Sequence, residues 1–129
     1  MTDSKRAFGT EGEELAARFL VKKKKMKLLQ KNFCVRGGEI DLILMDKNTL
    51  VFCEVKTRTQ RSSHLGSAAL AVDHRKQRHL THAAKIFLAK FGREYRYEDC
   101  RFDVIELYLP EPPTTVYVRH TPYAFEARR

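Results

Sequence analysis

The order of apolar and polar residues along the chain predicts five β-strands, because alternation or short apolar runs bounded by turn residues are typical of strands. The pair Gly37-Gly38 marks a turn after the first strand. The polar residues 46–49 are few enough to join the second and third strands as an antiparallel hairpin, so the first three strands form a meander. Pro110, Pro112 and Pro113 separate the last two strands. The predicted strands are residues 28–35, 39–45, 50–56, 101–109 and 115–119.

Two longer stretches carry apolar residues at helical spacing. The first helix is predicted at residues 10–25, where Thr10 followed three positions later by Glu13 has the form of a capping box. The second, residues 73–91, is amphipathic and is stopped by Gly92. Residues 57–72 begin polar and show no clear period, so we expect a flexible loop there, of a length that is often functional.

Length and composition favour one compact cytoplasmic domain. The 129 residues, 43% of them hydrophobic, have the size of a single domain, residues 1–129. The charged N-terminus lacks the apolar stretch of a secretory signal, and no run of about 18 apolar residues occurs, so we expect no membrane segment. Cys34, Cys53 and Cys100 are odd in number and form no C-x-x-C pair, which argues against a disulfide framework or a zinc site. We expect them to be reduced.

The chain is strongly basic, with 25 Lys and Arg against 16 Asp and Glu and a net charge of +9. Polyanions are natural partners of such a surface, and affinity for nucleic acid would fall as salt rises. The alternative is a soluble basic protein whose cations are only solvated. The lysine run at residues 22–25 has the same two interpretations. The candidates for phosphate contacts are Arg58, Arg61, Arg75, Arg78, His82 and Lys85.

Charged residues interrupt the apolar strands of the predicted hairpin. Successive strand residues point to opposite faces, so residues 39, 41 and 43 share one face and residues 40, 42 and 44 form the other, the expected core face. Asp41 lies in the first strand, and Glu54 and Lys56 share a face of the second. Such charges are costly unless they are paired or bound to a metal, so three on adjacent strands indicate a site. Asp103 also interrupts an apolar strand, and we predict that it pairs with an arginine in a structural role.

A bound Mg²⁺ ion is the specific explanation of Asp41 and Glu54. Mg²⁺ prefers oxygen ligands, usually one or two carboxylates, and keeps several waters for a phosphate and a nucleophile. Lys56 lies roughly 6.5–7 Å beyond Glu54, near enough to orient a metal-bound water or to neutralise charge on the phosphate. The alternative is a salt bridge of Lys56 with either acid. The string GGEIDLILMDKNTLVFCEVKTR favours the metal, because it joins a turn, an acid, a short loop and an E-x-K triplet.

Asp41 followed by Glu54-Val55-Lys56 resembles the D…(D/E)-x-K motif of the PD-(D/E)XK nucleases, a superfamily that includes restriction endonucleases and archaeal Holliday junction resolvases. Ile40 stands where the name of the superfamily has proline. The chain is more closely similar to the uncharacterised, endonuclease-like YraN family, over nearly its whole length. This resemblance implies an α/β, restriction-endonuclease-like sandwich with a central mixed β-sheet flanked by helices. The segments that carry it are residues 9–17, 38–43, 50–58, 101–104 and 120–125.

The resemblance also implies roles for two further residues. Glu13 matches the acid that related resolvases carry on their first helix, where it would reach the metal directly or through water. As a capping-box residue it would need no such role. Lys76 lies on the core-facing side of the second predicted helix, from which it would point toward the site or contact the nucleic acid. It would otherwise be an ordinary surface lysine.

Together these residues predict a metal-dependent endonuclease that acts on DNA, with branched or structured DNA among its candidate substrates. Asp41, Glu54 and Glu13 would hold Mg²⁺, for which Mn²⁺ can substitute, Lys56 would stabilise the transition state, and water would be the nucleophile. The main alternative is a non-catalytic nucleic-acid-binding module with the same fold, and RNA is an alternative substrate. Resolvases cut two strands and dimerise, so a homodimer is one expectation, although no patch in the sequence identifies an interface.

Overall fold

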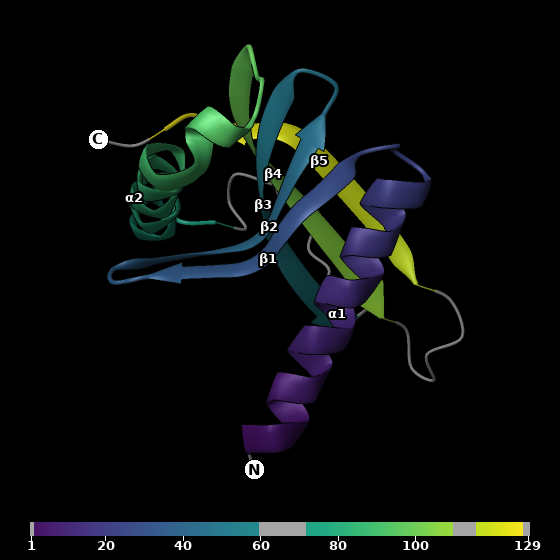
Figure 1. Cartoon of the computed structure of the whole chain (residues 1–129). Helices are drawn as coiled ribbons and strands as arrows, with labels where there is room; N and C mark the ends of the chain where they lie inside the picture. Colours follow the sequence, from purple (N-terminus) through teal and green to yellow (C-terminus); the bar gives the residue numbers. More distant parts are fainter. Residues whose placement is uncertain (1, 60–71, 110–115, 128–129) are drawn as a thin grey trace.

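A computed structural model describes residues 2–59, 72–109 and 116–127, which form a five-stranded sheet with a helix on each side (Figure 1). The strands are β1 Lys27–Val35, β2 Gly38–Asp46, β3 Thr49–Thr59, β4 Asp99–Leu109 and β5 Tyr117–Phe125. Strands that follow one another in the chain are neighbours in the sheet. The pairs are antiparallel except β3 and β4, which run parallel. The sheet is therefore mixed, as expected.

Helix α1, Thr2–Lys22, and helix α2, His74–Phe91, lie on opposite faces of the sheet (Figure 1). The arrangement is the expected α/β sandwich. Within the described residues, neither helix is long and apolar enough to cross a membrane. The core beneath α1 includes Ala16, Leu20, Leu42, Leu44, Val51, Cys53, Ile105 and Leu107. The core beneath α2 includes Phe33, Ile40, Ile43, Phe52, Leu80, Phe87, Phe102 and Val104.

The ends of α2 agree with the sequence-based prediction. Asp73 is the N-cap, and its carboxylate accepts a hydrogen bond of 2.8 Å from the backbone N–H of Lys76. Gly92 is the C-cap, and its N–H donates to the carbonyl of Leu88. Asp73 and Gly92 therefore satisfy backbone groups that would otherwise have no partner within the helix.

Helix α1 differs from the prediction, since it begins at Thr2 and not at Thr10. The capping-box interpretation of Thr10 and Glu13 was therefore wrong. The pattern Thr-x-x-Glu also fits inside a helix, where residues three apart lie on one side. The helix ends at Lys22, three residues earlier than predicted, and Lys25 adopts a left-handed backbone with φ of 59°. Glu13 thus lies within the helix, freed from any capping role.

Strands β3 and β5 depart most from their predicted bounds, and both pair with β4. Strand β3 continues through the polar residues to Thr59, each residue facing one of β4 in parallel register. The predicted loop at residues 57–72 was therefore wrong at its start, and residues 60–71 lie outside the described residues. Strand β5 runs over Tyr117–Phe125 instead of residues 115–119. Its register shifts between Phe102 and Val104 of β4, so its polar residues do not show a simple alternation.

The alternation of faces along β2 also departs from the prediction. Ile40 is buried with Ile43 beneath α2, whereas Leu42 is buried beneath α1, so a strict period of two fails between residues 40 and 42. Both faces are covered by helices, so both sets of residues are core and the single core face expected was wrong. At its start the strand lies against α2, where a Cβ atom at Gly38 would collide with the backbone of His79. The β1–β2 turn therefore packs directly on α2.

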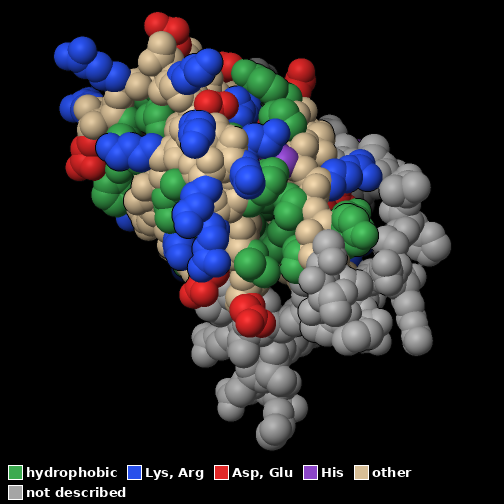
Figure 2. Space-filling view, turned by 90° about the vertical axis from the view of Figure 1, so that its right-hand side faces the viewer, with side chains coloured by type: hydrophobic (Ala, Val, Ile, Leu, Met, Phe, Trp, Pro, Cys, Tyr) green, Lys and Arg blue, Asp and Glu red, His purple; other side chains and the backbone are tan. Residues whose placement is uncertain are grey.

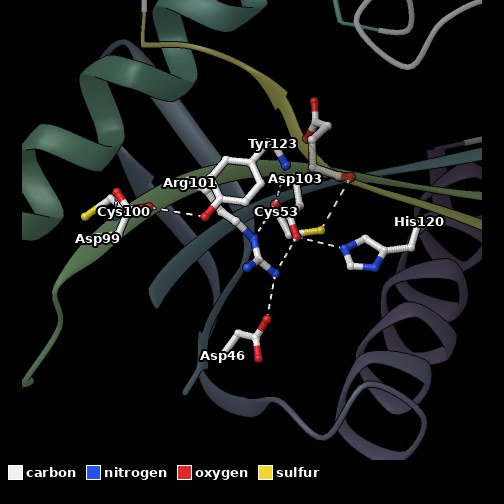
Figure 3. Close-up of polar contacts among 9 residues, drawn as sticks. Asp46, Cys53, Asp99, Cys100, Arg101, Asp103, His120 and Tyr123 are labelled. Atoms are coloured by element: carbon white, nitrogen blue, oxygen red, sulfur yellow. Dashed lines mark hydrogen bonds and ion pairs between the residues drawn. The ribbon is translucent and has the colours of Figure 1, made fainter. Parts of the chain in front are cut away.

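Asp103 on β4 lies at the centre of a buried charged network (Figure 3). Its Oδ1 atom is 2.9 Å from Nε of Arg101, whose Nη2 atom is 2.9 Å from Oδ2 of Asp46. Oδ2 of Asp103 is 2.7 Å from Nε2 of His120, and Oδ1 also accepts the backbone N–H of Tyr123. The predicted structural pairing with an arginine is confirmed. The network joins β2, β4 and β5.

Replacing Asp103 with Asn should lower stability strongly. The side chain is 0% exposed, and breaking a buried ion pair from one side commonly costs about 3 kcal/mol or more, roughly 10 °C in melting temperature for a chain of this size. Thermal unfolding followed by circular dichroism measures the effect. The control is Glu94→Gln, which removes the same charge from an exposed side chain and should stay within about 0.5 kcal/mol. Equal melting of the two variants would contradict the structural role.

Candidate active site

Asp41 lies at the point where β2 leaves β3. Backbone pairing of the two strands begins one residue later, at Leu42↔Cys53. The Oδ2 atom of Asp41 accepts a hydrogen bond of 2.9 Å from the backbone N–H of Val55. The carboxylate thus takes the place of a backbone acceptor and is held beside the E-x-K segment. Adjacent antiparallel strands at this position were predicted, and that prediction is confirmed.

The side chain of Glu54 is buried next to Asp41. Glu54 is 3% exposed, and burial, a hydrogen bond with Asp41 and the negative charge of Asp41 raise the pKa of its carboxyl to about 9, against smaller opposing effects of Lys76 and Lys56. In the absence of a cation, the pair therefore retains a proton near neutral pH. The structure brings the two predicted acids together, and their part in metal binding stays a prediction.

Glu13 approaches Asp41 from α1. The helix lies very close to β3 here, since a Cβ atom at Gly12 would collide with the hydroxyl of Thr57. Burial and the charge of Asp41 raise the pKa of the Glu13 carboxyl, while a hydrogen bond with Asn32 lowers it. Glu13 is therefore a neighbour of Asp41 whose side chain is already engaged by β1.

Two lysines flank Glu54 from different elements. The Nζ atom of Lys76, in the first turn of α2, lies 3.4 Å from Oε2 of Glu54, and the two side chains are 38% and 4% exposed. Lys76 therefore does point at the site, one of the two placements expected for it. Lys56 is half-buried two residues after Glu54, and its charge acts on the Glu54 carboxyl. The ion pair expected as an alternative to the metal thus involves Lys76 instead of Lys56.

The donor atoms of this site suit a hard divalent cation. Asp41 and Glu54 offer carboxylate oxygens, the ligands that Mg²⁺ prefers, and a cation would relieve the repulsion between them. Among residues 2–59, 72–109 and 116–127, no three His, Cys, Asp or Glu side chains gather closely enough to form a metal site. Two carboxylates are nevertheless a common protein contribution to Mg²⁺, which keeps several waters. The Asp41–Glu54 pair therefore fits the ion, with Glu13 outside the pair.

Glu106 is a buried acid near this site that the sequence analysis missed. It faces Lys56 in the parallel register of β3 and β4 and is 4% exposed. Its Oε2 atom is 3.2 Å from Nε of Arg58 and accepts the hydroxyl of Tyr108 at 2.9 Å, and its Oε1 atom is 3.4 Å from Nε of Arg119. An acid in an apolar strand was the available signal, the same one that identified Asp103. Arg58 is therefore held by Glu106, which limits its reach toward a phosphate.

Comparison with known proteins places the chain in a family. The sequence model described as "Uncharacterised protein family UPF0102" matches residues 12–107. The chain belongs to the UPF0102 family. A UPF0102 protein of Caldanaerobacter subterraneus subsp. tengcongensis is 43% identical over 123 residues, covering 95% of this chain and 97% of that protein. The UPF0102 protein YraN of Salmonella agona is 45% identical over 92 residues, covering 71% and 69%. The resemblance to the YraN family is thereby confirmed.

The UPF0102 match extends over the whole candidate site. Residues 12–107 include the acids Glu13, Asp41 and Glu54 and the lysines Lys56 and Lys76. A third relative, a UPF0102 protein of Geobacter metallireducens, is 42% identical over 123 residues, covering 94% of this chain and 93% of that protein. The range matched by the family model ends within β4, so β5 lies beyond it.

The predicted phosphate contacts of this UPF0102 protein lie in different surroundings. Arg75 and Arg78 are exposed on α2, and Lys85 is exposed beside a cavity on the same helix. The Nε2 atom of His82 lies 3.0 Å from the carbonyl oxygen of Arg36, so this side chain supports the β1–β2 turn. Arg61 lies outside the described residues.

A second basic surface lies at the end of α1. Figure 2 shows Lys and Arg side chains spread over the face of the molecule that carries α1, with acidic side chains mostly toward its margins. Exposed cations here come from the end of α1, the turn after it and β1. They include Arg18, Lys22, Lys23, Lys24, Lys25, Lys27 and Lys31.

Proposed function

We propose that this UPF0102 protein is a Mg²⁺-dependent endonuclease that hydrolyses phosphodiester bonds in DNA, on a restriction-endonuclease-like fold. The observation that carries the proposal is the pair of carboxyls, Asp41 and Glu54, held side by side where β2 and β3 separate, with Lys56 two residues further on. Branched or structured DNA belongs to the proposed substrate class. The excess of basic residues supports a polyanionic partner.

Asp41 and Glu54 would hold the ion, Glu13 would assist from α1, and Mn²⁺ would be an alternative to Mg²⁺. When bound, the cation would lower the pKa of a water molecule and neutralise negative charge on the phosphate. The backbone N–H of Val55 donates to Asp41 and keeps its carboxylate in position. This carboxylate would therefore need little reorganisation to bind the ion.

The lysines and arginines would act on the substrate. Lys56 would stabilise the charge that develops on the phosphate. The Nζ atom of Lys76 lies 3.4 Å from Glu54 in the structure described here, and on cation binding it would become available to the DNA backbone. Arg75, Arg78 and Lys85 would contact phosphates along α2.

A non-catalytic nucleic-acid-binding module is the second candidate function, and one observation favours it. The contact of Lys76 with Glu54, and the proton that the two acids retain, stabilise the buried acid without any metal. In such a module the same residues would serve the fold, and the basic surface would bind nucleic acid.

Thermal melting with and without metal, combined with a cleavage panel, separates the two functions. The endonuclease should be stabilised by Mg²⁺ or Mn²⁺, by about 2.7 kcal/mol when the ion is at one hundred times its dissociation constant. It should also cut at least one of linear, single-stranded, flapped or four-way DNA. RNA of matched sequence serves as the comparison substrate. Melting that is independent of metal, together with no cleavage on the panel, would support the binding module instead.

A further inference from the structure

Tyr123 on β5 is an exposed aromatic residue held in an unfavourable backbone conformation. Its φ is +53°, a left-handed value that bulky residues rarely adopt, and 61% of the residue is exposed. The backbone N–H of Tyr123 donates to Oδ1 of Asp103, and its hydroxyl donates to Oδ2 of Asp99 at 3.2 Å. The fold therefore fixes this ring at the surface, and residues held in such conformations are frequent at binding sites.

The guanidinium of Arg101 supports the ring from one side. The guanidinium carbon, Cζ of Arg101, lies 5.3 Å from the centre of the Tyr123 ring (Figure 3). Arg101 is itself held between Asp46 and Asp103, so its position is fixed by two carboxylates. These carboxylates also compensate its charge. Arg101 therefore acts as a rigid backing for the ring and is poorly placed as a phosphate ligand.

A cavity of about 360 Å³ lies beside Tyr123, between α2 and the ends of β4 and β5. Its walls are mostly apolar, and two of them, Phe102 and Phe125, are stacked at 4.9 Å. The exposed side chains of Lys85 on α2 and of Glu126 after β5 also line the cavity. A flat apolar group would match the aromatic wall, and a negative charge attached to it on the α2 side would meet Lys85.

We propose that Tyr123 stacks on an unpaired nucleobase of a DNA strand at the mouth of this cavity, with Lys85 contacting a neighbouring phosphate. The inference rests on the proposed function in so far as DNA is the partner, and it narrows the substrate class. Aromatic rings stack with bases of any sequence, but only where a base is not already stacked within a duplex. The substrate then contains single-stranded or branched DNA.

Fluorescence gives a direct test because the chain contains no tryptophan. Tyr123→Trp places a single tryptophan, which can be excited selectively, at the proposed site. Tyr117→Trp is a matched control on the same strand, since Tyr117 is 58% exposed and Tyr123 61% exposed. A twelve-nucleotide thymidine strand and a twelve-base-pair duplex would be titrated into each protein without divalent metal. We expect the single strand to quench Trp at position 123, but neither ligand to quench Trp at position 117.

Substitution of the ring gives the corresponding affinity change. Tyr123→Ala should weaken binding of the single strand about 5- to 100-fold, the range for losing one base–aromatic stack. Binding of the duplex should change less than about twofold. Tyr123→Phe keeps the ring and should bind the single strand within about threefold of wild type. The melting temperatures of Tyr123→Phe and Tyr123→Trp check that β5 is folded in these variants.

Four results would overturn the stacking proposal. These are equal quenching at both positions, equal quenching by single strand and duplex, a Tyr123→Ala variant that binds the single strand as wild type does, and no single-strand binding by any variant. Because these measurements need no cleavage, an inactive protein that still shows quenching at position 123 alone would refute the endonuclease and leave the stacking site standing.

Discussion

Replacing Glu54 with Gln should abolish DNA cleavage, by about 10³-fold or more, while DNA binding persists or tightens. An amide is a poor ligand for Mg²⁺, and losing the ion removes both its activated water and its charge, which are worth several kcal/mol. Binding should not suffer, because the substitution adds no negative charge to a site that faces a polyanion. Asp41→Asn should behave in the same way. Cleavage rates and fluorescence anisotropy with labelled DNA measure the two effects.

Glu39→Gln is a matched control for these substitutions. Glu39 is exposed two residues before Asp41 on the same strand, so Glu39→Gln makes the same chemical change without touching the buried pair. The Glu54→Gln protein should also melt near the wild-type temperature in the absence of metal. Burial and Asp41 raise the pKa of Glu54 to about 9, so the amide replaces a side chain that is protonated near neutral pH. Undiminished cleavage by either acid variant would refute the proposed metal site.

Replacing Lys56 with Ala should reduce the cleavage rate by about 10²–10³-fold, with little effect on metal binding. A positioned cation at a reacting phosphate is worth a few kcal/mol in the transition state, and alanine keeps both carboxyls. Stabilisation of the protein by Mg²⁺ should therefore remain, and DNA affinity should change little. Single-turnover cleavage and melting with metal test this.

The control for Lys56 is Lys90→Ala, which removes one exposed lysine from the last turn of α2. It should leave the cleavage rate within about twofold, since a distant exposed charge is screened by salt. If Lys56 served the fold alone, Lys56→Ala would lower the melting temperature and leave the rate intact.

The hairpin of the candidate site could be predicted from the sequence because its determinants are local. The Gly37-Gly38 turn, the short loop at residues 46–49 and the E-x-K triplet of Glu54 lie within about twenty residues of each other. Parity placed Glu54 and Lys56 on one face, and it held along β3. The same parity rule failed at Ile40 of β2. Packing on α2 bends this part of β2 away from β3, and no local sequence pattern indicates that bend.

Contacts between distant elements were not predictable in the same way. The pairing of Glu106 with Arg58 and Arg119 depends on the registers of β3 and β5 against β4, which pattern alone does not specify. The pairing of β5 with β4 is irregular, and polar residues surround Pro122. The full length of β5 could therefore not be predicted from alternation. The contact of Lys76 with Glu54 was one of several orientations that a helical wheel allows.

The parallel pairing of β3 with β4 also has a consequence for the order in which the protein folds. The bond from Val55 to Asp41 closes a separation of 14 residues, whereas the contacts of Arg58 with Glu106 and of Arg101 with Asp46 close 48 and 55. Distant contacts form more slowly because more chain entropy is lost before they are made. A two-stranded hairpin alone is only marginally stable in water. We therefore expect the two acids to stay mobile until β4 has docked, so that a partly synthesised chain on the ribosome would not yet cut DNA.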